Sequence, residues 1–235
     1  LQGTRPITNV IGDTSTMLHG TRANAPIKSL AEVAWTGFVN CPASKSDGMR
    51  RVIPLVGMVQ DTIYPSLVLQ ILMQLEETSS EEVEVIMGES IKVPKLDGGL
   101  WEIPIDETGA MAINYRNTAL LEITDYVATM GELGGYERTG IWPDGYPPLI
   151  DQIVIIGQSA EGLQDLGPTP YSPRDPLFRI QATALNNILQ GDFISHAPKG
   201  LSIGIWLLVA SLTLFLLRKA PVTLDMIVPF LVVAC

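Results

Sequence analysis

Histidine and cysteine are scarce in this chain. Its 235 residues include two histidines, His19 and His196, and two cysteines, Cys41 and Cys235. The histidines lie in separate loops, so the sequence offers no ligand spacing that predicts a metal site. The cysteines lie in a polar loop and at the end of an apolar run, and we expect no disulfide between them. We therefore expect no metal and no cofactor, and Cys41 has no neighbouring histidine to activate it.

Basic residues are also few. The chain has 15 Lys and Arg against 25 Asp and Glu, a formal net charge of -10. Adjacent basic pairs occur only at Arg50-Arg51 and Arg218-Lys219. Binding to a phosphate backbone needs clustered cations, so we exclude a nucleic-acid partner. Hydrophobic residues make up 46% of the chain, enough to fill a core.

Signals of targeting and repetition are missing too. The chain begins at Leu1 without the basic, apolar and small-residue regions of a signal peptide. We therefore interpret it as a fragment whose N-terminal portion is missing. It contains no internal repeat and no low-complexity tract.

A long apolar run is present near the C-terminus. Residues 201–217, LSIGIWLLVASLTLFLL, carry no charge and approach the length of about 20 residues that crosses a bilayer as a helix. Arg218 and Lys219 follow, and basic residues favour the cytoplasmic side of a membrane. The sequence predicts a transmembrane helix over 201–219, with residues 1–198 forming one extracytoplasmic domain.

A second apolar segment covers residues 222–235 and predicts the start of a second membrane helix, although Asp225 and Pro229 interrupt it. An alternative for the first run is a buried helix of a soluble protein. Such a helix needs a polar stripe. The run offers only three hydroxyl residues for one: Ser202, Ser211 and Thr213.

Hydrophobic periodicity predicts the elements of the extracytoplasmic part. The expected helices cover 27–34, part of 64–77, 123–130 and 177–190, the last capped by Gly191. The expected strands cover 35–40, part of 48–60, 83–87, 91–93, 100–105, 111–115 and 151–157. We expect the first two strands to form a hairpin. The continuous apolar run of 151–157 is typical of a strand covered on both faces.

This order of elements predicts the fold class. It is α/β (or α+β), a mixed-sheet domain with flanking helices, followed by the C-terminal transmembrane helix. Ligands in open α/β sheets bind at the carboxyl ends of strands, which makes Ser159, Asp165 and Thr169 candidate ligand-binding residues. Arg116 follows the strand MAINY and is placed to meet an anion. The alternative role of each is a hydrogen bond that stabilises its loop.

Other polar patterns have simpler interpretations. Asp47 and Arg50 are expected to form a turn and an ion pair. Gly157 to Gly162 reads Gly-x-Ser-x-x-Gly, one residue longer than a nucleophile elbow, so Ser159 is a poor candidate nucleophile. The carboxylates of LEETSSEEVE, residues 75–84, are expected to be solvated. We predict no catalytic residue and do not interpret the chain as an enzyme.

Several segments follow one another in an order known from one family. They are GFVNCPASKSDGMRRVIPLV, YPSLVLQIL, IPIDETGAMAINY, QIVIIGQSAEGLQDLGPTP and ATALNNILQGDFI. This order, from Ile27 to Leu217, resembles the type-two CHASE domain, an extracellular sensory domain associated with cyclases and histidine kinases. The family usually has Pro-Gly followed by His-Ala near the last helix, whereas residues 177–182 read LFRIQA. A role that depends on that histidine is not carried over.

The resemblance implies a function and a location. The chain would be the ligand- or partner-sensing region of a receptor in the inner or plasma membrane, with residues 1–198 in the periplasm or outside the cell. It would regulate a cyclase or kinase module that lies outside this chain. The expected partners are membrane lipid, an unknown extracytoplasmic ligand or protein, and a second copy in a homodimer. Two alternatives remain: an envelope structural or interaction module, and a membrane-anchored hydrolase with Ser159 beside a base.

Overall fold

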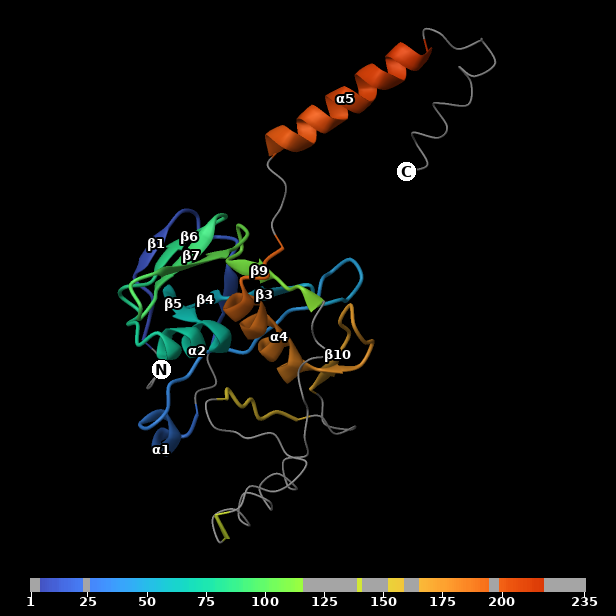
Figure 1. Cartoon of the computed structure of the whole chain (residues 1–235). Coiled ribbons are helices and arrows are strands. Elements are labelled where there is room, and N and C mark those ends of the chain that lie inside the picture. Colours follow the sequence, from blue (N-terminus) through green and yellow to red (C-terminus); the bar gives the residue numbers. More distant parts are fainter. Residues whose placement is uncertain are drawn as a thin grey trace. The chain divides into compact units, whose positions relative to one another are not determined.

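The computed structural model describes residues 5–22, 26–115, 139–140, 152–158, 165–194 and 199–217 (Figure 1). The chain divides into two compact units, Leu1–Ile194 and Ser195–Cys235. The first unit is a mixed α/β domain with several small sheets and few helices, which confirms the mixed-sheet fold class.

The largest sheet has four strands in the order β1-β6-β7-β8. These strands are β1 (Asn9–Ile11), β6 (Glu84–Ile86), β7 (Ser90–Pro94) and β8 (Leu100–Pro104). β1 pairs with β6 in parallel, while β6, β7 and β8 form an antiparallel meander. Turns at 87–89 and 95–99 join these three strands as hairpins.

The remaining strands form three smaller sheets. One joins β2 (Leu18–Gly20), β4 (Val56–Val59) and β5 (Thr62–Pro65), with β4 and β5 antiparallel. The others pair β3 (Val52–Pro54) with β9 (Ala110–Ala112), and β10 (Leu166–Gly167) with β11 (Asp175–Pro176). Gln60 and Asp61 turn the β4–β5 hairpin with φ of 50° and 61°, the pair of positive values that a type I′ turn requires.

Two helices of the first unit pack against each other. α2 (Leu67–Leu75) begins at Ser66, whose Oγ accepts a hydrogen bond from Leu69 N at 3.2 Å. α4 (Leu177–Gln190) ends at Gly191, which has the left-handed φ of 62° that suits glycine. Figure 1 shows α2 and α4 side by side below the strands, and α2 also contacts β5. A short helix, α1 (Lys28–Ala31), precedes them.

The core lies between these helices and the sheets. It is built from fully buried aliphatic side chains of both: Ile53, Leu55, Val56, Val68, Leu69, Leu72, Val85, Ile91, Val93, Ile103, Met111, Ile180 and Ile188. Each fully buried side chain of this size contributes about 1.5–3 kcal/mol. Because side chains of α2 and α4 belong to the same buried cluster as those of the strands, the two helices are part of the main core of the domain.

Several predicted elements are confirmed. The helix predicted over 177–190 forms with these limits and is capped by Gly191 as expected, and α2 forms within the helical stretch predicted in 64–77. The strands predicted within 83–87, 91–93, 100–105 and 111–115 are β6, β7, β8 and β9. The helix predicted over 27–34 is shorter. The helix predicted over 123–130 lies outside the described residues.

Two strand predictions are wrong. Residues 35–40 make a single bridge, Phe38 to Ser66, and the hairpin forms between β4 and β5 instead. Residues 48–60 contain two strands, β3 and β4, and these pair with β9 and with β2 and β5, so neither pairs with 35–40. Residues 152–158 form no strand, and Ile153, Val154 and Ile156 are 42%, 55% and 70% exposed. An apolar run predicts a buried strand only where other strands cover it, and here no described strand pairs with it.

The second unit contains α5 (Lys199–Leu217), so the long apolar run is helical. In the part of the chain that the structure describes, no helix combines the length and hydropathy of a membrane span. Residues 218–235, which include the predicted second membrane helix, lie outside the described residues.

Candidate functional site

Two of the four predicted ligand-binding residues can be located. Asp165 and Thr169 lie beside β10, in the segment that leads to α4. Ser159 and Arg116 lie outside the described residues. β10 pairs antiparallel with β11, so this segment is not at the carboxyl edge of a parallel sheet. The argument that predicted a ligand pocket here therefore does not apply to these two residues.

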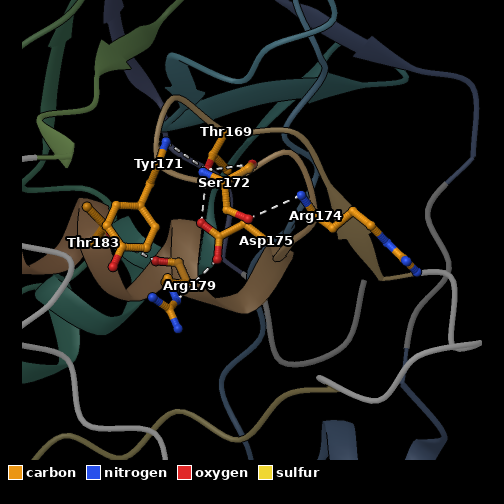
Figure 2. A network of polar contacts seen from close by, with 7 residues as sticks. All are labelled: Thr169, Tyr171, Ser172, Arg174, Asp175, Arg179 and Thr183. Atoms are coloured by element: carbon orange, nitrogen blue, oxygen red, sulfur yellow. Dashed lines mark hydrogen bonds and ion pairs between the residues drawn. The ribbon is translucent and has the colours of Figure 1, made fainter.

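Thr169 holds its own loop together. Its Oγ1 accepts hydrogen bonds from the backbone N–H of Tyr171 and Ser172, at 3.3 and 3.1 Å, and donates to Asp175 Oδ2 at 2.9 Å (Figure 2). Its backbone N–H donates to Ser172 O at 2.8 Å. The residue is 2% exposed. Thr169 has the loop-stabilising role that the sequence left as the alternative to ligand binding.

Asp175 is the centre of this cluster. The residue is 2% exposed, and its Oδ1 lies 3.2 Å from Arg179 Nε, one helical turn along the chain. Asp175 and Arg179 therefore form an ion pair. The Arg179 Nε–H does not point at the carboxylate well enough to form a hydrogen bond with it. The Arg179 guanidinium also lies over the Tyr171 ring, 5.7 Å from its centroid. We call Thr169, Tyr171, Ser172, Asp175 and Arg179 the Asp175 network.

The Asp175 network fixes the start of α4. Asp175 belongs to β11, Arg179 lies in the first turns of α4, and Figure 2 shows the loop folded over both. Leu177 N donates to Asp165 O at 3.0 Å, which adds a backbone link to β10. A buried acid held by a hydroxyl and a guanidinium positions a helix and leaves no free carboxylate for chemistry.

A second polar group adjoins this loop. Arg50 Nε donates to Cys41 O at 3.0 Å, and Tyr115 Oη donates to Arg50 O at 2.8 Å. A Cβ on Gly167 would overlap the Arg50 guanidinium, so the side chain lies directly against β10. These contacts link three segments: the loop before β3, residues 113–115 that follow β9, and β10.

Arg50 does not form the predicted ion pair with Asp47. The partner is Arg51, whose Nη1 lies 2.7 Å from Asp47 Oδ2. Arg50 is drawn toward Cys41 and Gly167, which leaves the next arginine to meet the acid. The predicted turn is present, since Met49 N donates to Asp47 Oδ1 at 3.1 Å. That hydrogen bond, and then Arg51, lower the pKa of Asp47.

The environment of Cys41 makes a poor nucleophile. Its Sγ donates to Val52 O at 3.3 Å, and burial raises the pKa of Cys41 to about 11, with the Arg50 charge opposing only part of that effect. Burial also raises the pKa of Tyr115 well above its ordinary value. Both groups are therefore protonated at neutral pH.

We expect slow alkylation of Cys41 in the folded chain. With a pKa near 11, the thiolate fraction at pH 8 is about a hundredfold below that of an unfolded thiol. Iodoacetamide labelling of a Cys235→Ser chain, followed by mass spectrometry, should show this ratio between native and urea-unfolded protein. The native rate should rise about tenfold per pH unit up to pH 11. A native rate within about threefold of the unfolded rate at pH 8 would contradict the burial effect.

Sequence reasoning missed Asp175 and Arg179. The signal was an acid and an arginine four residues apart at a predicted helix start, DPLFR. In the ranges that the structure describes, no three His, Cys, Asp or Glu side chains gather as metal ligands. The described polar clusters order loops and a helix end, as a scaffold for binding requires.

The described residues of the first unit form a mixed α/β domain in which a buried polar network fixes the start of α4. Comparison with protein families matches residues 5–216 to the CHASE2 domain, and the chain belongs to that family of extracellular sensory domains. The predicted resemblance is thereby confirmed. Neither curated proteins nor solved structures give a match.

Proposed function

We propose that this chain is the extracytoplasmic sensory region of a transmembrane signalling receptor. A ligand or a partner protein binds the first unit, and the response leaves through α4. The CHASE2 match supports sensing. The observation that carries the receptor role is the uncharged apolar run that follows the domain within about ten residues of the end of α4.

The side chains of α5 support a place in lipid. Ile205, Trp206 and Leu207 are 54%, 72% and 65% exposed. The two hydroxyls toward its end are bonded within the helix: Ser211 Oγ donates to Leu208 O at 2.9 Å and Thr213 Oγ1 to Val209 O at 2.8 Å. Polar groups in a hydrocarbon core need such internal partners. We infer that this run spans the inner or plasma membrane, with Arg218 and Lys219 on the cytoplasmic side.

The end of α4 is the output element of the domain. Asn187 is 1% exposed, and its amide bonds to both backbone groups of Asn114: Asn114 N donates to its Oδ1 at 2.9 Å, and its Nδ2 donates to Asn114 O at 3.0 Å. Asn114 Nδ2 also donates to Asp192 Oδ1 at 3.0 Å. A shift of α4 therefore displaces two parts of the chain together: Asn114, which follows β9, and Asp192, which begins the connection to α5.

The regulated module is a cyclase or kinase on the cytoplasmic side, as the family association implies, and the receptor acts as a homodimer. A second candidate function is an interaction module that packs against another envelope protein. The exposed apolar run of Ile153, Val154 and Ile156 favours it, because such side chains are usually covered by a partner.

Reporter fusions to the full chain test the sidedness. Alkaline phosphatase, active only outside the cytoplasm, should be active when inserted after Ile194 and inactive when fused after Lys219. Green fluorescent protein should give the opposite pattern. A chain with Arg218→Glu and Lys219→Glu is the matched control, and it should lose much of this asymmetry. Phosphatase activity at both positions, or at neither, would overturn the receptor proposal.

A further inference from the structure

A cavity lies beside the C-terminal half of α2, away from the Asp175 network. Its volume is about 270 Å³, near the lower end of ligand pockets. Gln70 and Met73 of α2 line it, together with Arg5, Trp35 and the segment 77–80 that follows the helix. A space of this size suits a small molecule and not a protein segment.

The cavity contains polar side chains that lack partners. Gln70 is 3% exposed, and its amide forms no hydrogen bond with the residues that the structure describes. Ser80 is also 3% exposed, and its hydroxyl is likewise unbonded within the described ranges. Neither the Gln70 amide nor the Ser80 hydroxyl is among the fully buried polar atoms without a partner in the described residues, which are Ser90 Oγ, Arg179 Nε and Gln181 Oε1, so both groups stay open to the cavity. Both groups line the cavity, so an occupant of the cavity can supply the missing partners.

Charges of both signs meet at the same cavity. The Arg5 guanidinium lies 5.3 Å from the centroid of the Trp35 ring, and the indole is 46% exposed. Glu77 lines the cavity as well, held at a positive φ of 52°. Within the described part of the chain, neither Arg5 nor Glu77 has an ion-pair partner. Both residues are exposed and hydrated, and a ligand in the cavity that carries charges of both signs can pair with each of them.

We propose that this cavity binds a small zwitterion of amino-acid type with an apolar or aromatic side chain. The Arg5 guanidinium binds its carboxylate and Glu77 its ammonium group. The ligand side chain packs on Met73 and Trp35, while the Gln70 amide bonds to the polar end. This assignment rests on the proposed sensory function and names its ligand class.

The position of the cavity also provides a route for the signal. α2 carries Gln70 and Met73, and α2 packs against α4. A ligand that draws the polar face of α2 toward Arg5 and Glu77 changes this helix pair, and α4 is the output element. The ligand shifts the equilibrium only by its difference in affinity for the two helix arrangements.

Calorimetry on the full chain in mild detergent tests the ligand class. The probes are the free amino acids and, for each aromatic one, two analogues: the arylpropionic acid without the ammonium group and the arylethylamine without the carboxylate. At least one amino acid should bind, and its binding should quench the fluorescence of Trp35. Both analogues of that amino acid should bind with an affinity at least about tenfold lower. If no amino acid binds, or if an analogue binds as tightly, the inference is overturned.

Variants separate a ligand role for Gln70 from a structural one. Gln70→Leu should leave the Tm of the ligand-free chain within about 2 °C, because the amide faces the open cavity and forms no hydrogen bond among the described residues, and should weaken binding at least about tenfold. Arg5→Gln should weaken binding similarly. Lys95→Gln is the matched control, since Lys95 lies 3.8 Å from the centroid of the Trp101 ring, outside the cavity. Unchanged binding in Gln70→Leu would overturn the inference.

The two proposals fail separately. Loss of the expected sidedness with binding intact rejects the receptor role and keeps the amino-acid site. Absence of binding with the expected sidedness rejects the ligand class alone.

Discussion

Replacing Gly37 with alanine should destabilise the first unit by about 3 kcal/mol or more. A Cβ at this position would lie 2.6 Å from Leu67 N and 2.6 Å from the carbonyl carbon and oxygen of Ser66. These are backbone atoms at the start of α2. No rotamer change can relieve the overlap, so either the helix start or the chain around Gly37 must move.

Neither side of that contact is free to move. Leu67 N donates to Phe38 O at 2.8 Å, and Ser66 N donates to Leu55 O at 2.8 Å. Ser66 also caps α2 through its Oγ. Moving the helix start would therefore break a cap and two buried backbone hydrogen bonds.

Urea denaturation followed by circular dichroism measures the effect of Gly37→Ala. Gly204→Ala is the control, since Gly204 lies in α5 with open space around its Cβ position and should lose nothing. A loss below about 1 kcal/mol for Gly37→Ala would contradict the close approach.

Removing the carboxylate of Asp175 should cost about 3–5 kcal/mol. Asp175→Ala leaves the Arg179 guanidinium, whose side chain is 18% exposed, without its counter-charge, and leaves the Thr169 hydroxyl without its acceptor. Arg179→Ala leaves the buried acid with Thr169 alone. The start of α4 and the loop between β10 and β11 should loosen in both variants.

A double-mutant cycle isolates the pair. The loss in the Asp175→Ala, Arg179→Ala chain should be smaller than the sum of the single losses by about 1–3 kcal/mol. Asp47→Ala is the matched control on an exposed pair, with side chains 41% and 54% exposed, and should cost less than about 1 kcal/mol. Strictly additive losses at Asp175 and Arg179 would show that the two residues act independently.

The elements that could be predicted from the sequence are those determined by neighbouring residues, through hydrophobic periodicity, helix caps and turns. The helices over 67–75 and 177–190 follow from apolar periodicity and from caps at Ser66 and Gly191. The strands from 83 to 112 are separated by Gly turns that are legible in the sequence. Pairings between distant segments, such as β1 with β6, depend on tertiary packing and left no local pattern.

The site residues were harder to predict for the same reason. Thr169 was predicted as a ligand-binding residue, with a loop-stabilising hydrogen bond as the alternative, and its buried partner Asp175 was identified only by the fold. The cavity beside α2 combines Arg5, Trp35 and Gln70, which are far apart in the sequence. The two glutamines of the otherwise apolar helix, Gln70 and Gln74, were the available signal, because a polar side chain on such a helix needs a partner when it is buried.

The double contact of Asn187 with Asn114 sets a threshold for any response that leaves through α4. The side-chain amide takes the place of a neighbouring strand by satisfying both the N–H and the C=O of one peptide position. Partial displacement leaves both groups unsatisfied, at about 1–3 kcal/mol each. We therefore expect that a ligand or partner must supply this free energy before the end of α4 moves away from Asn114.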